Sequence, residues 1–221
     1  MGRMQPQPLE RCVEICNSLP TKYAAIVAIG VSTGCRISEI LALRRGDLIE
    51  NGRLRREVEF LKLKARCKAK RRMIIPEAYR PYIIQHLNEE AERGFTTRED
   101  FVFRGQFGNP LERMTVYNFF RKTFGPNFGT HWMRKTFAVA MYQFYSQKYN
   151  ETFKAANMVK QLLGHARLDT TARYLCLDEA EQYADIETVF ALENRRHRND
   201  SEASEGSHME EQKESDGLRA K

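Results

Sequence analysis

The sequence predicts a mainly α-helical domain that carries one small antiparallel β-hairpin. Apolar residues recur at helical spacing near the N-terminus and again from Met114 to about residue 196. Between these two regions, β-type segments flank a single cationic run, which is the pattern of a hairpin with a basic turn. A chain of 221 residues has room for one sizeable domain with its own core, or for that domain plus an appendage.

Two helices are expected at the N-terminal end of the chain. Residues 9–19 and residues 23–32 both place apolar side chains three and four positions apart. Pro20 and Thr21 separate the two patterns, and a threonine directly before a helical pattern is a favoured N-cap. We therefore expect the second helix to begin after Thr21.

Gly34 ends that second helix, and a third, short helix is expected directly after it. Its apolar face is formed by Ile37, Ile40, Leu41 and Leu43, so Arg36 lies at the helix N-terminus beside a glycine turn. A cation is mildly unfavourable at the positive end of the helix dipole. An arginine at this place makes more sense if an anion also binds there.

The basic hairpin is expected within residues 52–76. Residues 58–63 and 73–75 are rich in strand-forming side chains, and Pro76 ends the second of them. The cationic run Lys62–Arg72 lies between them and is expected to form the turn region.

The remainder of the ordered chain is predicted to be helical. A helix over 77–93 is stopped by Gly94, and residues 101–103 are expected to be a short extended piece. Further helices are expected at residues 114–124, 132–147, 153–163 (closed by Gly164), 170–175 and 178–193.

Charge divides the chain into a basic domain and an acidic tail. The net charge is +7 and the pI about 9.2. Residues 199–221 contain seven acidic and three basic residues, a net charge of −4, which leaves +11 on residues 1–198. We therefore expect a domain over 1–198 that binds a polyanion, nucleic acid before membrane, and a disordered tail over 199–221. The tail contains Gly206-Ser207-His208-Met209, a pattern typical of an expression-vector junction.

The cysteines indicate neither a metal site nor a disulfide framework. There are five, an odd number, and none follows a Cys/His ligand spacing. Cys12 and Cys16 stand one helical turn apart, as in a packed apolar stripe. With no signal peptide and no apolar run long enough to span a membrane, the chain is expected to be cytoplasmic with reduced thiols.

Four motifs occur in one order along the chain. They are Thr33-Gly34-Cys35-Arg36-Ile37-Ser38-Glu39-Ile40, Thr130-His131-Trp132-Met133-Arg134, Leu163-Gly164-His165 and Thr171-Ala172-Arg173-Tyr174. The series Arg … His-x-x-Arg … Gly-His … Tyr resembles the tyrosine recombinases, the phage-integrase-like enzymes that break and join DNA. The resemblance spans about residues 7–192.

The resemblance implies the tyrosine recombinase catalytic fold and a metal-free reaction without a cofactor. Arg36 and Arg134 correspond to the two phosphate-binding arginines, and Glu39 to the acidic residue that supports Arg36. His131 and His165 correspond to the hydrogen-bonding or proton-accepting histidines, while Trp132 and Met133 between the two motif residues are expected in the core. Tyr174 matches the nucleophile, which would form a 3′-phosphotyrosyl link to DNA.

The catalytic lysine of the family ends the first hairpin strand, beside the turn. Lys68 is the candidate here, and Lys64 is the alternative if the turn is longer. Most of the remaining cations of this run are expected to contact the phosphate backbone. The expected DNA-binding residues are Arg44, Arg45, Lys62, Arg66, Lys70, Arg71, Arg72, Arg121, Lys122 and Lys135.

The expected partners are double-stranded DNA and other protomers, assembled on DNA as a synaptic tetramer, with no membrane. The reaction would be integration, excision, inversion or resolution, by a bacterial or phage-encoded enzyme acting at the nucleoid. Type IB topoisomerase activity, telomere-resolvase activity and a non-catalytic DNA-binding relative remain alternatives. Only about thirty-five residues precede Arg36. The resemblance therefore does not extend to the separate N-terminal DNA-clamping domain of most integrases. The chain is expected to be either a trimmed one or one of the short recombinases that act on invertible elements.

Overall fold

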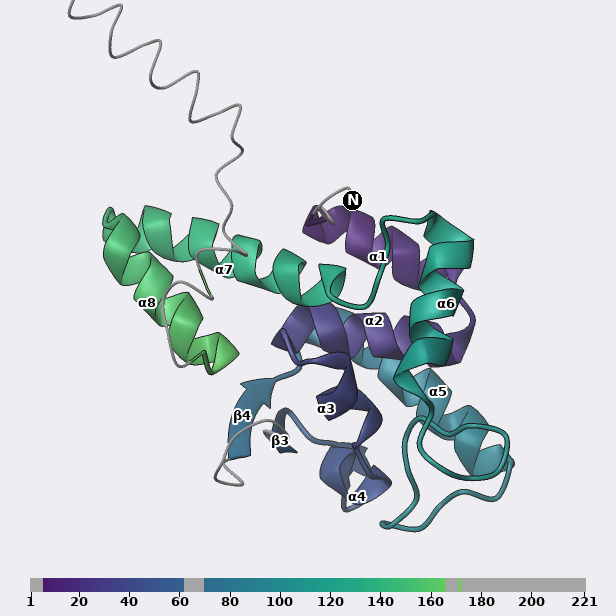
Figure 1. Cartoon of the computed structure of the whole chain (residues 1–221). Helices are drawn as coiled ribbons and strands as arrows, with labels where there is room; N and C mark the ends of the chain where they lie inside the picture. Colours follow the sequence, from purple (N-terminus) through teal and green to yellow (C-terminus); the bar gives the residue numbers. More distant parts are fainter. Residues whose placement is uncertain (1–5, 62–69, 166–170, 172–221) are drawn as a thin grey trace, which may run out of the picture. The chain divides into compact units, whose positions relative to one another are not determined.

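A computed structural model describes residues 6–61, 70–165 and 171, and these residues form a helical unit with two small antiparallel sheets (Figure 1). The predicted fold class, mainly helical with a small antiparallel hairpin, is confirmed. The described residues belong to one compact unit, Met1–Leu175. The helix expected at 178–193 and the tail expected from 199 lie outside the described residues, so both stay predictions.

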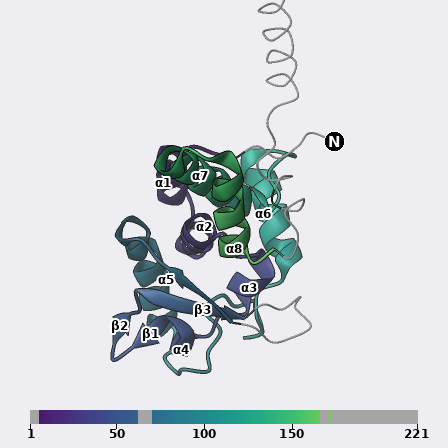
Figure 2. The same cartoon turned by 90° about the vertical axis from the view of Figure 1, so that its left-hand side faces the viewer.

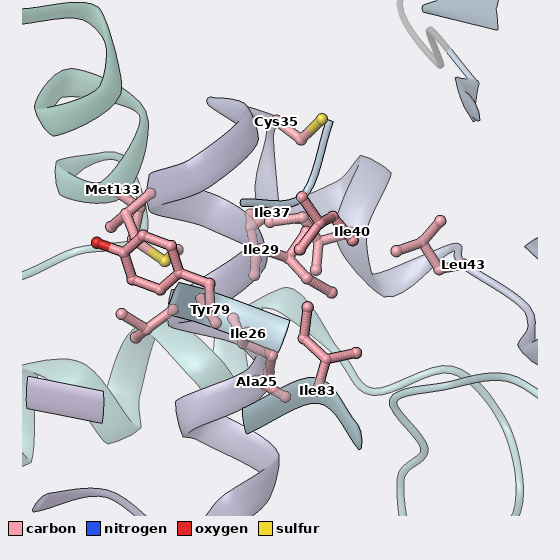
Figure 3. Packing of buried hydrophobic residues seen from close by; sticks show 14 of the residues in the cluster. Ala25, Ile26, Ile29, Cys35, Ile37, Ile40, Leu43, Tyr79, Ile83 and Met133 are labelled. Atoms are coloured by element: carbon pink, nitrogen blue, oxygen red, sulfur yellow. The ribbon is translucent and has the colours of Figure 1, made fainter. Parts of the chain in front are cut away.

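Helix α2 (Thr21–Thr33) forms the centre of this unit. Every residue from Ala24 to Thr33 is buried, and the helix packs against α1 (Leu9–Ser18), α5 (Arg80–Glu92) and α7 (Trp132–Tyr149) (Figure 2). A helix that is apolar on all sides needs such complete cover. Figure 3 shows how Ala25, Ile26 and Ile29 of α2 lie in this core, with Ile83 of α5 and Met133 of α7 around them.

Helices α2 and α7 approach closely because α2 has a glycine at their contact. A Cβ atom at Gly30 would lie 2.5 Å from Sδ of Met133. Trp132 and Met133 are 0% and 1% exposed, which confirms their predicted place in the core. The close contact fixes the start of α7, where two of the predicted site residues stand.

The predicted N-cap of α2 is wrong. The helix begins at Thr21 itself, with Pro20 in the N-cap position and no side-chain cap. The Thr21 hydroxyl donates instead to the carboxylate of Glu89 on α5. A tertiary hydrogen bond therefore takes the place of the local cap.

The predicted basic hairpin is present as β3 (Glu57–Leu61) and β4 (Lys70–Ile74). The strands are antiparallel, and Val58 stands opposite Met73 while Phe60 stands opposite Arg71. Val58, Phe60 and Met73 are buried, so this face of the hairpin meets the core. Since side chains alternate along a strand, Arg71 belongs to the same inward face.

A short helix and a second hairpin precede it and were not predicted. They are α4 (Arg45–Leu48), β1 (Ile49–Glu50) and β2 (Arg53–Leu54). Asn51 and Gly52 connect the two strands, both with positive φ (50° and 74°). Asn-Gly is the strongest short-range signal for such a turn. The signal was present in the sequence, although the strands beside it are only two residues long.

The remaining elements follow the predicted order. The expected helix over 77–93 is divided into the 3₁₀ turn η1 (Glu77–Tyr79) and α5, and residue Phe101 makes an isolated antiparallel bridge with Arg44. The later helices are α6 (Arg113–Phe124), α7 and α8 (Thr152–Leu163), and α7 and α8 pack against each other. Of the helix expected at 170–175, only Thr171 is described, and it is helical.

Cys12, Cys16 and Cys35 are free and buried. Burial raises the pKa of both Cys12 and Cys16 to about 12, which fits the predicted apolar stripe and leaves these thiols protonated. Within the described ranges, no helix is long and apolar enough to cross a membrane.

Candidate active site

The site begins at the turn between α2 and α3 (Ile37–Leu41). Gly34 ends α2 in the left-handed conformation with φ 61°, and Arg36 is the N-cap of α3, as predicted. The Arg36 backbone N–H donates to Oε2 of Glu39 at 2.8 Å, and the Arg36 guanidinium donates to Oε1 at 3.1 Å. Glu39 therefore holds both the backbone and the side chain of Arg36, while its predicted role as a supporting acid in catalysis stays a prediction.

Gly34 is the point at which three helices meet. A Cβ atom there would lie 2.4 Å from Cδ1 of Phe137 on α7 and 3.0 Å from Cδ2 of Leu163 on α8. The positive φ and the missing side chain are both required, because α7 and α8 occupy the space that any other residue would fill. The turn that carries Arg36 is thereby held against the ends of the two helices that carry the next motifs.

Arg134 lies in the first turns of α7 and is 1% exposed. Its guanidinium donates to the carbonyl of Gly34 and, at 2.8 Å, to the carbonyl of Leu163. These carbonyls belong to the C-terminal ends of α2 and α8, where backbone acceptors lack helical partners and the helix dipole is negative. Two helix ends thus stabilise a buried positive charge.

His165 follows α8 and is 8% exposed. Its Nε2 lies 2.9 Å from Nη2 of Arg134, and its Nδ1 lies 3.0 Å from the hydroxyl of Thr171. Arginine can only donate, so Nε2 is the acceptor and the proton is on Nδ1, which donates to Thr171. Burial, followed by the charges of Arg134, Arg36 and Arg71, lowers the pKa of His165 to about 4. The imidazole is therefore neutral at pH 7.

Arg71 completes the buried cluster from the hairpin. Its side chain is 9% exposed and its guanidinium lies 3.6 Å from Oε2 of Glu39. It donates to the carbonyl of Leu162 at 2.7 Å and to Sγ of Cys35 at 2.8 Å. Burial raises the pKa of the Cys35 thiol although Arg71 opposes this effect. The arginine expected to contact DNA has its donors directed into the protein.

His131 and Arg134 have different surroundings. His131 is the N-cap of α7 rather than part of the helix, and its side chain is exposed, whereas Arg134 is buried. The helical spacing alone predicted that both side chains face the same way. Lys135, which follows Arg134, is half-buried.

Two of the other expected DNA-binding arginines bind backbone carbonyls. Arg44 donates to the carbonyl of Glu99 and covers the ring of Phe101 at 4.3 Å, and Arg45 donates to the carbonyl of Leu87 at 3.1 Å. These contacts tie α4 to the chain around residue 100 and to α5.

The remaining cations are more open or lie elsewhere. Arg72 is 70% exposed beside Glu59, and Arg121 is exposed and donates to the hydroxyl of Tyr117 at 2.9 Å. Lys122 is exposed on α6 and Lys70 begins β4. Lys62, Lys64, Arg66, Lys68 and Tyr174 lie outside the described residues.

Sequence reasoning assigned no role to Thr171 or Cys35. Thr171 stands in the nucleophile motif, three residues before Tyr174, but no sequence spacing predicts that its hydroxyl bonds to His165. For Arg71, the sequence did hold a signal of its inward position, because residues two apart on a strand share a face and Met73 and Ile75 are apolar. Among the residues with described positions, no three His, Cys, Asp or Glu side chains gather in a way that would hold a metal ion.

The family model described as the phage integrase family matches residues 2–181, and this chain belongs to that family. Curated protein sequences give no match. Solved structures of similar fold include the XerA recombinase, with a TM-score of 0.61 and 19% identity over 85% of this chain and 66% of that one. The XerH recombinase bound to palindromic difH substrate gives 0.59 and 22% over 85% and 54%. A lambda integrase dimer bound to a COC′ core site gives 0.52 and 16% over 80% and 49%. The chain thus spans about half to two thirds of the length of these structures.

Proposed function

We propose that the protein is a site-specific DNA recombinase that cleaves and rejoins strands through a 3′-phosphotyrosyl intermediate. One observation carries the proposal: the guanidinium of Arg134 joins the motif segments. It donates to the carbonyl of Gly34, two residues before Arg36, and to the imidazole of His165. Residues that are far apart in the sequence thus form one cationic cluster.

The cluster has the charge that a phosphodiester requires. Three guanidinium groups, those of Arg36, Arg71 and Arg134, meet here, and the carboxylate of Glu39 bonds Arg36 and lies beside Arg71. With a neutral His165, the described side chains of this cluster carry an excess of positive charge. Arg36 is the most open of the three, with 27% of its side chain exposed. It is the group best placed to receive a phosphate oxygen.

In the proposed step, the phenolic oxygen of Tyr174 attacks the scissile phosphorus and the bond to the 5′-oxygen breaks. The phenolic proton passes to a base, and the leaving 5′-oxygen takes a proton from a hairpin lysine, Lys68 or Lys64. Arg36 and Arg134 stabilise the charge that develops on the non-bridging oxygens. Attack by another 5′-hydroxyl reverses the step and restores the backbone without ATP.

The two histidines are proposed to have different tasks. Nε2 of His165 accepts a bond from Arg134, and Thr171 holds its other nitrogen, so His165 orients the arginine. His131 is exposed at the start of α7 and is the better candidate for the base that accepts the phenolic proton.

Double-stranded DNA is the proposed partner, with protomers paired on it as a synaptic tetramer. The basic domain supports DNA binding, and the similar XerH and lambda integrase structures are complexes with DNA, in one case of a dimer. We further propose that the recombinase domain spans residues 1–198 and that its reaction requires no metal ion. The protein is proposed to act at the nucleoid of a bacterial cell.

A nicked suicide duplex tests the proposed function. The duplex carries the native junction, with a nick placed so that the cleaved strand is lost and religation is blocked. The wild-type protein should form a covalent adduct that survives denaturation and EDTA. Tyr174→Phe should bind the duplex with unchanged affinity and form no adduct. An adduct with Tyr174→Phe, or one that needs a divalent metal, would contradict the proposal.

A further inference from the structure

Arg71 is a buried arginine within a basic run that otherwise suits a DNA-facing turn. Its Cα stands opposite that of Phe60 in the β3–β4 hairpin, on the inward face that also carries Val58 and Met73. Its neighbour Arg72, on the opposite face, is 70% exposed. The strand therefore directs one arginine outward and the other into the site.

The guanidinium of Arg71 contacts both ends of the catalytic cluster. On one side it reaches the Arg36 turn, through Sγ of Cys35 at 2.8 Å and Oε2 of Glu39 at 3.6 Å. On the other side it donates to the carbonyl of Leu162 at 2.7 Å, one residue before the carbonyl that Arg134 binds. A planar fork with several donors can make these contacts together, and a lysine ammonium cannot reproduce that geometry.

These contacts do not suit a direct grip on DNA. Arg71 is 9% exposed and directs donors from both terminal nitrogens to protein acceptors. A phosphate that took either of these N–H donors would leave the carbonyl of Leu162 or Sγ of Cys35 without its donor, and the small exposed fraction of the side chain leaves little room for a phosphate. The arrangement instead fixes the start of strand β4 relative to Arg36 and Arg134.

We infer that Arg71 is a positioning residue, which holds the hairpin so that its general-acid lysine reaches the leaving 5′-oxygen. Lys68 precedes Arg71 by three residues in the chain, and Lys64 precedes it by seven. The inference rests on the proposed cleavage reaction. It adds a residue that acts through the lysine and touches neither DNA nor the reacting atoms.

A bridging sulfur at the scissile position separates this role from a structural one. A 5′-thiolate leaves without being protonated, so a defect in the general acid disappears on that substrate. The measurement is the first-order rate of adduct formation on the oxygen and the sulfur duplexes, expressed as their ratio. Both substrates are cleaved by the same folded fraction, so partial unfolding of a variant does not change the ratio.

Arg71→Gln should cleave the oxygen duplex about 10- to 100-fold more slowly than the wild type, the range expected when a catalytic group is displaced by about an ångström. On the sulfur duplex its rate should return to within about 3-fold of the wild-type rate. Arg71→Lys keeps the charge without the fork and should behave similarly. It provides the same test if the glutamine variant does not fold.

Arg80→Gln is the matched control. Arg80 also donates to a carbonyl, that of Leu54 at 2.7 Å, but in the other hairpin and away from the cluster. Its sulfur-to-oxygen rate ratio should equal that of the wild type. Arg72→Gln, which removes an exposed cation from the same strand, should weaken DNA binding and leave the ratio unchanged.

Three results would overturn the inference. Equal slowing of Arg71→Gln on both duplexes would mean that Arg71 acts on the phosphate or only on the fold. Cleavage of both duplexes at the wild-type rate would mean that it has no role in the reaction. A wild-type protein that binds the junction and forms no adduct on either duplex would overturn the proposed function, and the inference with it.

Discussion

Replacing Gly34 by alanine should destabilise the protein more than replacing any described glycine that has a positive φ and open surroundings. Two costs add at this position. An L-residue at φ 61° costs about 1–2 kcal/mol relative to glycine. The new Cβ would also lie 2.4 Å from Phe137 and 3.0 Å from Leu163, and overpacking of this kind costs about 1–3 kcal/mol. The free energy of unfolding should therefore fall by roughly 2–5 kcal/mol.

The assay is equilibrium urea unfolding, with Gly94→Ala and Gly52→Ala as controls. Those glycines have φ of 91° and 74°, and nothing lies within 4 Å of a Cβ built on either. They should lose only the backbone cost of about 1–2 kcal/mol, so the difference from Gly34→Ala measures the contact of α2 with α7 and α8. The Gly34 carbonyl also holds Arg134, so adduct formation should slow in Gly34→Ala and not in the controls.

Equal destabilisation of Gly34→Ala and Gly94→Ala would contradict a packing cost at Gly34. It would mean that Phe137 and Leu163 move aside at no cost, and that the three helices are not locked at this glycine. Unchanged adduct formation in Gly34→Ala would show that the position of Arg134 does not depend on this turn.

Three further predictions concern charge and proton transfer. By NMR titration, His165 should stay neutral until about pH 4, its lowered pKa. The unfolded chain binds this proton near pH 6.5, so the free energy of unfolding should fall as the pH drops from about 6.5 to 4. A titration midpoint near 6.5 in the folded protein would contradict a buried, neutral His165. Lysine and arginine side chains of residues 44–72 and 121–135 should contact about six phosphates, so the logarithm of the DNA-binding constant should fall with the logarithm of the salt concentration with a slope near −5. A binding constant that does not change with salt would mean that the basic charge serves only solubility. If Lys68 is the general acid, Lys68→Ala should be slow on oxygen DNA and recover on 5′-sulfur DNA. Recovery by Lys64→Ala alone would move the role to Lys64.

Local sequence signals predicted the turn that carries Arg36. A glycine after a continuous apolar helix, followed by a new apolar pattern, was enough to place Arg36 at a helix N-terminus and Glu39 one turn later. The helices α5 to α8 were also recognisable from their apolar faces, and glycine follows α6 and α8 directly whereas Asn150 ends α7.

The contacts that assemble the site were not predictable from local patterns. Arg134 binds the carbonyl of Gly34, which is 100 residues away, and Arg71 binds that of Leu162, which is 91 residues away. Both partners are backbone atoms at helix ends, so no side-chain motif marks them. Thr21 is a further example: local rules predicted that its hydroxyl caps α2, but the hydroxyl donates to the distant carboxylate of Glu89.

The proposed role of Tyr174 as the nucleophile can be tested by the chemical identity of the covalent link between protein and DNA. The adduct trapped on the suicide duplex would be digested with nuclease and trypsin, and the nucleotide-bearing peptide sequenced by mass spectrometry. We expect a 3′-phosphate ester on the Tyr174 phenol, with no adduct in an Arg36→Ala or Arg134→Ala protein that still binds DNA. A nucleotide on Tyr149, Tyr183 or a serine, or a link through a 5′-phosphate, would contradict it.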